Sequence, residues 1–169
     1  FSKNEVGYKN LLNIISNAYM NHKENAYVDI EQLYKNKEGL LVLSGGNNSI
    51  LKYSNGNSIT SQSASFVADF KKEFIDNFYL EIQRIEGNDY RIDEEVILNL
   101  AYDNNIPVVA TNDVYFEGPE HFEAHDALMC IEKKLFVSQK DRKRLSKNHY
   151  FKSQNEMQEL FSDIPEALF

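Results

Sequence analysis

Short strand-like runs alternate with segments of helical periodicity along the chain, and no other feature of the sequence constrains the fold as much. The runs lie at residues 39–46, 78–85 and 106–111. The first and third are continuously apolar, as in buried strands, whereas 78–85 alternates apolar and polar side chains like a strand with one covered face. This order of elements predicts an α/β fold with parallel strands, whose functional groups gather at the carboxyl ends of the strands.

Helices are expected around these strands. Asp29 is a predicted N-cap, and Ser153 with Glu156 three residues later has the spacing of a capping box. Asn, Ser and Gly dominate residues 47–63, which predicts a surface loop, and residues 133–150 are interpreted as a charged connector. The helical patterns span 5–21, 29–33, 64–74, 92–104, 119–132 and 154–161.

The composition predicts a single acidic domain covering residues 1–169. At this length and 42% hydrophobic residues, the chain can bury one core, while 18 basic against 26 acidic residues give a net charge of -8. That charge opposes the approach of a phosphate backbone to the surface as a whole. A local basic cluster is interpreted as a solvated face, with a salt-sensitive nucleic-acid contact as the alternative. The cluster comprises Lys133, Lys134, Lys140, Arg142, Lys143, Arg144 and Lys147.

The single cysteine, Cys130, excludes an internal disulfide and fits a reducing cytoplasm. It lies in the apolar run 127–131, which predicts a small buried side chain. No run of 18 or more apolar residues is present, so no membrane span is expected. Because the sequence starts at Phe1 without an initiator methionine or signal peptide, we expect it to be a piece of a longer protein.

Three carboxylates are candidate metal ligands. Asp113 follows the third predicted strand, where a carboxylate can reach a metal ion, although a turn or capping role is the more common alternative. Glu81 and Glu86 are hard oxygen ligands that would join it, with surface charge at a strand end as the equal alternative. On the residues alone, these carboxylates do not make a complete metal site.

Two histidines and a glycine pair are weaker candidates. His121 and His125 are four apart on a predicted helix, which is a zinc-ligand spacing, but no third ligand lies nearby in the sequence. His125 beside Asp126 is alternatively a general base or a histidine satisfied inside a helix contact. Gly45-Gly46 follows a strand, yet no phosphate-binding motif accompanies it, so a turn is the better interpretation.

Several stretches together resemble the later part of the PHP (polymerase and histidinol phosphatase) domain of bacterial DNA polymerase III α subunits. The clearest are Ile106 to Phe116 and Phe122 to Ile131. The resemblance covers nearly the whole chain and keeps the family's order. The other matching stretches are 4–11, 38–46, 78–82, 150–153, 156–157 and 160–168.

The resemblance implies the later part of a distorted (β/α)7 barrel that leads a much longer polymerase chain. The family's His-x-His motif precedes the residues that align with Phe1, so half of any metal site lies outside this sequence. Family members with an intact site carry histidines at the positions of Ile85 and Tyr115, whereas the aspartate of the later motif is kept as Asp113. Neither replacement is a zinc or manganese ligand, so we expect no metal, no cofactor and no catalytic residue here, with Asp113 as a vestige.

The function implied by the resemblance is a non-catalytic scaffold that stabilises a replicative polymerase and docks a separate proofreading exonuclease subunit. The alternative is a metal-dependent 3'-5' exonuclease or phosphoesterase, which would need zinc or manganese. Nucleotide addition, its Mg²⁺ and contacts with DNA would belong to other regions of the parent chain. Other polymerase III holoenzyme subunits are the implied partners, in the cytoplasm and without a membrane.

Overall fold

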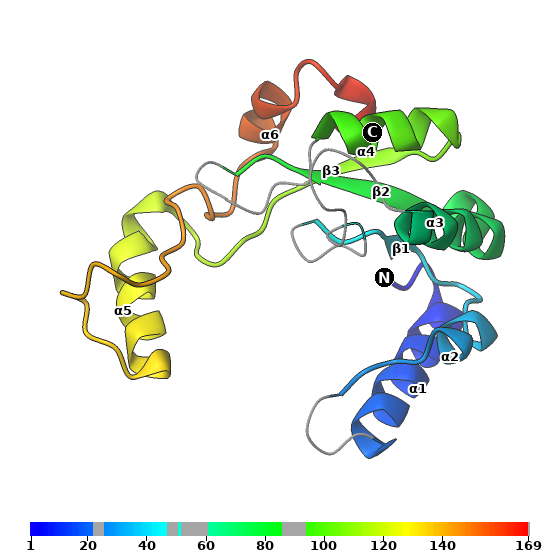
Figure 1. Ribbon diagram of the computed structural model, residues 1–169, viewed down its shortest axis with the longest axis horizontal. Coiled ribbons are helices and arrows are strands. Elements are labelled where there is room, and N and C mark those ends of the chain that lie inside the picture. The colour runs from blue at the N-terminus through cyan, green and yellow to red at the C-terminus, as the bar shows by residue number, and fades with distance from the viewer. Residues whose placement is uncertain (22–25, 47–50, 52–60, 86–93, 169) are drawn as a thin grey trace.

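The computed structural model describes residues 1–21, 26–46, 51, 61–85 and 94–168 (Figure 1). The helices predicted from apolar spacing are present within a few residues of their expected bounds. They are α1 (Glu5–Asn21), α2 (Ile30–Lys35), α3 (Ser61–Phe74), α4 (Glu94–Asp103), α5 (Phe122–Lys133) and α6 (Gln154–Leu160). The strands are β1 (Val42–Leu43), β2 (Phe78–Gln83) and β3 (Val108–Thr111), and the 3-10 helices are η2 (Ile75–Asn77), η3 (Pro119–His121) and η4 (Pro165–Leu168).

The three strands form one parallel sheet in the order β1-β2-β3, which confirms the predicted α/β class. Val42 is in register with Phe78, and Leu80 with Val108. Parallel neighbours need long crossovers, and α3 and α4 lie in the two connections of this sheet. The described strands do not close a barrel, so the (β/α)7 barrel stays a prediction.

The two faces of β2 differ in burial, as the alternating pattern predicted. Phe78, Leu80 and Ile82 are at most 1% exposed and join a core built with α3 and α4, whereas Tyr79, Glu81 and Gln83 are half-buried. Successive side chains of a strand point to opposite faces, so the second set lies together on the less covered face. The polar groups of β2 are therefore held at a half-open surface.

Aromatic side chains dominate the contact between α3 and the sheet. Phe66, Phe70 and Phe74 are four residues apart on α3, and the ring of Phe70 lies 5.5 Å from that of Phe78 on β2. Phe70 also stacks on both of its α3 neighbours and meets the Tyr34 ring edge-on at 5.8 Å. This ring cluster fixes α2 and α3 against the start of β2.

Two predicted strands are less buried than the sequence indicated. β1 has only two residues, both partly exposed, and only Val108 of β3 is fully buried. Both are edge strands of the described sheet, so neither has strand neighbours on both sides. The prediction of continuous burial was wrong there because apolar runs do not reveal position within a sheet.

The predicted surface loop at 47–63 lies mostly outside the described residues. Leu51, one of its few described members, is 1% exposed and belongs to the hydrophobic core. The helix expected from residue 64 already begins at Ser61. The start of the helix predicted at 92–104 also falls outside the description, and α4 is seen from Glu94.

Residues 119–149, here called the arm, stand apart from the sheet. Figure 1 shows α5 and the irregular segment after it on the left, away from α1 to α4. The two ends of the arm meet at its root. There the Tyr115 amide donates to the His149 carbonyl at 2.9 Å, and Phe116 forms an isolated parallel β-bridge with Tyr150. Most residues of the arm are consequently exposed to solvent.

Candidate functional site at the carboxyl edge of the sheet

Glu81 is the centre of a hydrogen-bond network near the carboxyl ends of the strands. The amide side chain of Gln83 donates to Glu81 Oε1 at 3.1 Å and to Thr111 Oγ1 at 2.9 Å, and the Thr111 hydroxyl also donates to Glu81 Oε1. The backbone amide of Glu81 donates to Ser44 Oγ at 2.9 Å. One carboxylate oxygen of Glu81 is thus committed to connecting β2 with β3.

The glycine pair after β1 allows a left-handed backbone conformation at Gly45 and a close approach of the Gln83 side chain at Gly46. Gly45 has a φ of 79°, in the left-handed region that glycine adopts without strain. A Cβ on Gly46 would lie 2.1 Å from the side-chain amide carbon of Gln83. These contacts favour the turn interpretation over a phosphate cradle.

Asp113 lies beside His149, a residue that the sequence interpretation missed. His149 Nδ1 is 2.9 Å from the Asp113 carbonyl oxygen and 3.8 Å from its carboxylate. Because a carbonyl only accepts, Nδ1 carries the proton and donates. His149 is 3% exposed in an irregular segment, where no periodicity could have indicated its burial.

Tyr115 lies between two imidazole rings. Its ring meets His125 at 5.6 Å and His149 at 5.4 Å, edge-on in both cases. Burial, and to a lesser degree the Asp113 charge, raises the pKa of the Tyr115 hydroxyl, which keeps it neutral. Tyr115 is thus an aromatic side chain packed at the root of the arm.

The helical histidines do not act as a pair. His121 is exposed beside Glu120, at 3.9 Å, whereas His125 packs on the rings of Tyr115 and Phe116. Asp126 does not hold His125, because arginines bind its carboxylate. The structure thus favours the packed-histidine alternative for His125 over a carboxylate-held general base.

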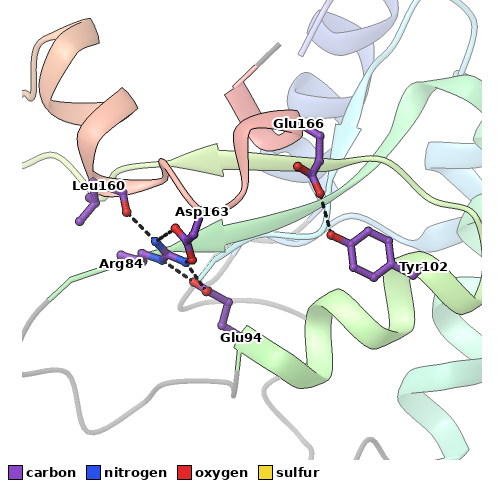
Figure 2. Close-up of polar contacts among 6 residues, drawn as sticks. All are labelled: Arg84, Glu94, Tyr102, Leu160, Asp163 and Glu166. Carbon is purple, nitrogen blue, oxygen red and sulfur yellow. Dashed lines mark hydrogen bonds and ion pairs between the residues drawn. The ribbon is translucent and has the colours of Figure 1, made fainter.

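Arg84 ties the carboxyl end of β2 to two other segments (Figure 2). Its guanidinium donates to both Glu94 carboxylate oxygens, at 2.9 and 2.6 Å, and to both Asp163 oxygens, at 2.6 and 2.7 Å. It also donates to the Leu160 carbonyl at 2.5 Å. These bonds raise the pKa of Arg84 further and lower that of Asp163. The next residue, Ile85, is 2% exposed.

Two arginines of the basic cluster bind carboxylates within the arm itself. Arg142 donates to both oxygens of Asp126 at 2.5 Å each, and both side chains are at most 4% exposed. Arg144 lies 3.2 Å from Asp126 and 3.1 Å from Glu123, with its guanidinium 5.0 Å from the centre of the Phe122 ring. The Arg142 hydrogen bonds are the main cause of a lowered Asp126 pKa. The arginines of this cluster therefore stabilise the arm.

Among the described residues, the donor set does not fit a zinc or manganese ion. Over the described ranges, no three His, Cys, Asp or Glu side chains lie close enough to hold a metal, and the candidate Glu86 falls outside those ranges. Glu81 is bonded within the sheet, and Asp113 belongs to the root of the arm. We therefore derive no chemistry through a metal from these residues.

A cleft of about 460 Å³ opens near Glu81 and is mostly apolar. Val42 and Leu43 of β1, Leu11 of α1 and Leu33 of α2 contribute to its walls. Thr111 and Asn112 supply further polar atoms, but the Asn112 side-chain amide donates to the Tyr150 carbonyl at 2.6 Å. Among the described residues that line it, none is a histidine, cysteine or lysine, so this lining offers packing surface rather than an acid-base pair.

Comparison with known proteins places these features in a family. The PHP domain family matches residues 1–85, half of the chain. DNA polymerase III subunit alpha of Caulobacter vibrioides is 39% identical over 168 residues, covering 98% of this chain and 15% of its own length. The Vibrio cholerae and Pasteurella multocida proteins of the same name are 38% and 36% identical over 99% of the chain. The chain spans about 15% of the length of these relatives. Among the described helices, none combines the length and apolar character of a membrane span.

Proposed function

This chain belongs to the PHP domain family, and from its homology to DNA polymerase III α subunits along nearly its whole length we propose that it is a non-catalytic scaffold within a replicative polymerase. In this role the domain stabilises the parent chain and docks a separate proofreading exonuclease subunit. Nucleotide addition with Mg²⁺, and contact with DNA, belong to other regions of that parent chain. The setting is the bacterial cytoplasm, among the other holoenzyme subunits.

The polar side chains at the carboxyl ends of the strands bond to other parts of the chain, which supports the proposed scaffold role. Thr111 and Gln83 bind Glu81, and Asp113 positions His149 at the root of the arm. The resemblance to the family implies histidines at the positions of Ile85 and Tyr115 in members with an intact metal site. Here Ile85 is buried and Tyr115 is packed between imidazoles. These groups join structural elements together and leave no cluster of donors for a hydrolytic metal among the described residues.

The two-faced sheet supports a place for the chain in a larger barrel. Helices α3 and α4 contribute to the core on the apolar face of β2. In a β/α barrel, helices cover the outside and the opposite face lines the interior. The half-buried Tyr79, Glu81 and Gln83 would then be interior residues of a complete (β/α)7 domain.

The test uses the full-length parent α subunit. We expect no stoichiometric zinc or manganese after purification with either metal supplied, no 3'-5' hydrolysis of a single-stranded oligonucleotide, and stable binding of the proofreading exonuclease subunit. An Asp113→Ala variant should, like the unaltered protein, show no hydrolysis. Stoichiometric metal together with hydrolysis that Asp113→Ala abolishes would establish the alternative, a metal-dependent exonuclease.

A further inference from the structure

The positive charge of this acidic chain is concentrated in one short part of the arm. Residues 133–147, here called the basic segment, hold seven of the 18 basic side chains and only one of the 26 acidic ones. The rest of the chain therefore has 11 basic against 25 acidic residues. A net charge of -8 for the whole chain hides this separation. A polyanion that the rest of the surface repels can still approach the arm.

Ion pairs within the arm account for the arginines of the basic segment but not for its lysines. Arg142 and Arg144 bind carboxylates of α5. Four exposed lysines have no carboxylate oxygen within 4.0 Å among the described residues, and their charge is therefore not compensated by a direct contact. They are Lys133, Lys134, Lys140 and Lys147.

An aromatic ring lies exposed among these lysines. Phe136 is 75% exposed and lies two residues after Lys134 and four before Lys140. A phenylalanine of the core is buried, whereas this ring offers its faces to solvent. The basic segment thus combines uncompensated positive charge with a free aromatic surface.

Hydrogen bonds fix the backbone that carries this ring. The Phe136 amide donates to Gln139 Oε1 at 2.7 Å, and the Gln139 amide donates to the Phe136 carbonyl at 3.0 Å. Arg142, which binds Asp126 of α5, also donates to the Val137 carbonyl at 3.2 Å. A segment held in this way loses little conformational entropy when it binds a ligand.

These features fit a single strand of nucleic acid better than a duplex or an acidic protein. Proteins that bind single strands without sequence preference use positive charge along the phosphates and aromatic rings on which unpaired bases stack. In a duplex the base faces are already stacked on each other, so an exposed ring gains nothing there. An acidic protein surface would use the lysines but has no bases to stack on Phe136.

We propose that the basic segment binds single-stranded nucleic acid, with its lysines on the phosphates and a base stacked on Phe136. This inference goes beyond the scaffold function, which leaves DNA synthesis and its DNA contacts to other regions of the parent chain. The arm adds a short contact that does not depend on base sequence. Four lysines on a single strand predict a slope of about -3 for the logarithm of the binding constant against the logarithm of the salt concentration.

The experiment locates this contact in the full-length parent α subunit, where other regions also meet DNA. An oligothymidine strand that carries iodouracil is crosslinked to the protein by light, and the protein is digested with trypsin. Cleavage after Lys134 and Lys140 isolates residues 135–140, in which Phe136 is the single aromatic residue. We expect an adduct in this peptide, with half-saturation that shifts with salt by the slope given above.

Competitor strands test whether a base stacks on the ring. An unlabelled oligothymidine should displace the adduct. A strand of the same length without bases should compete about tenfold more weakly, because it keeps the phosphates and loses the stacked base. A duplex of the same length, and polyglutamate of matched charge, should also compete more weakly than the single strand.

A double variant tests the lysines and keeps both trypsin sites. Lys133→Gln with Lys147→Gln should weaken half-saturation of the adduct and reduce the salt slope to about half, because two of the four phosphate contacts are removed. Lys72→Gln is the matched control, since Lys72 is an exposed lysine on α3, outside the arm, and this variant should leave the adduct unchanged.

Four results would overturn the inference. The first is adducts elsewhere in the parent chain and none in residues 135–140. The second is equal competition by the strand without bases, which would show that no base stacks on Phe136. The third is equal competition by polyglutamate or duplex, which would show a surface for acidic proteins or for any polyanion. The fourth is an unchanged salt slope in the double lysine variant. The scaffold function is independent of all four, because metal content, hydrolysis and subunit binding test it.

Discussion

Replacing Phe70 by alanine removes the ring at the centre of the packing between α3 and β2. Phe70 is 6% exposed and its ring lies 4.6 to 5.8 Å from four others. Truncating a buried phenylalanine costs about 3–5 kcal/mol, through lost burial and the cavity left behind. We expect a loss of about 4 kcal/mol, a large part of the roughly 5–15 kcal/mol that stabilises a domain. Phe70→Leu keeps an apolar side chain and should cost about 1.5 kcal/mol.

Phe136→Ala provides the matched comparison, because it makes the same chemical change at a side chain that is 75% exposed. Its effect on stability should stay within about 0.5 kcal/mol. Urea unfolding followed by far-ultraviolet circular dichroism measures both, and Phe70→Ala should lower the midpoint by roughly 2 M for a slope of about 2 kcal/mol per M. Equal losses of stability from the two variants would refute this expectation, because Phe136 would then be packed within the chain and not exposed.

Three further changes test separate contacts. Ser153→Ala removes the α6 capping box and should cost about 1 kcal/mol of stability, measured by the same urea unfolding. Gly7→Ala should destabilise the protein by about 1–3 kcal/mol, because the added Cβ would lie 1.9 Å from the Gly39 carbonyl oxygen. This loss is expected although alanine favours helices more than glycine does. A gain in melting temperature would contradict the close contact. Because the pKa of Asp126 is lowered in the folded protein, its ionised carboxylate adds stability that is fully present above the unfolded pKa of about 3.9 and is lost as pH falls through the folded pKa. Amide hydrogen exchange at residues 134–147 should therefore accelerate as the pH falls through that range. In Asp126→Asn, which has no carboxylate to protonate, this pH-dependent acceleration should be absent.

Local patterns predicted much of the fold. The period of apolar residues located α1 at its observed bounds, Glu5–Asn21, and the Ser153 capping box is present. The alternation along β2 predicted which of its faces is buried. These features depend on neighbours along the chain, whereas the edge positions of β1 and β3 depend on the sheet order, which no local pattern encodes.

The site was harder to predict because its groups meet through long-range contacts. Arg84 and Asp163 are 79 positions apart, and His149 reaches Asp113 from 36 positions away. Asp113 was a candidate because of its place after a strand, but no local pattern indicated that His149 would lie beside it. The adjacency of His125 and Asp126 suggested a pair, although successive helical residues do not face each other.

Arginines and lysines have different environments in the arm. Arg142 and Arg144 are bound to carboxylates, and Arg142 does so almost entirely out of solvent. A planar guanidinium suits such bidentate contacts, whereas a lysine ammonium is strongly hydrated and is better kept at the surface. Lys133 and Lys134, at the end of α5, are exposed next to Phe136. A cluster that resembles one basic patch in the sequence therefore separates into arginines that build the arm and lysines that are exposed to solvent, which is why net charge alone describes this surface poorly.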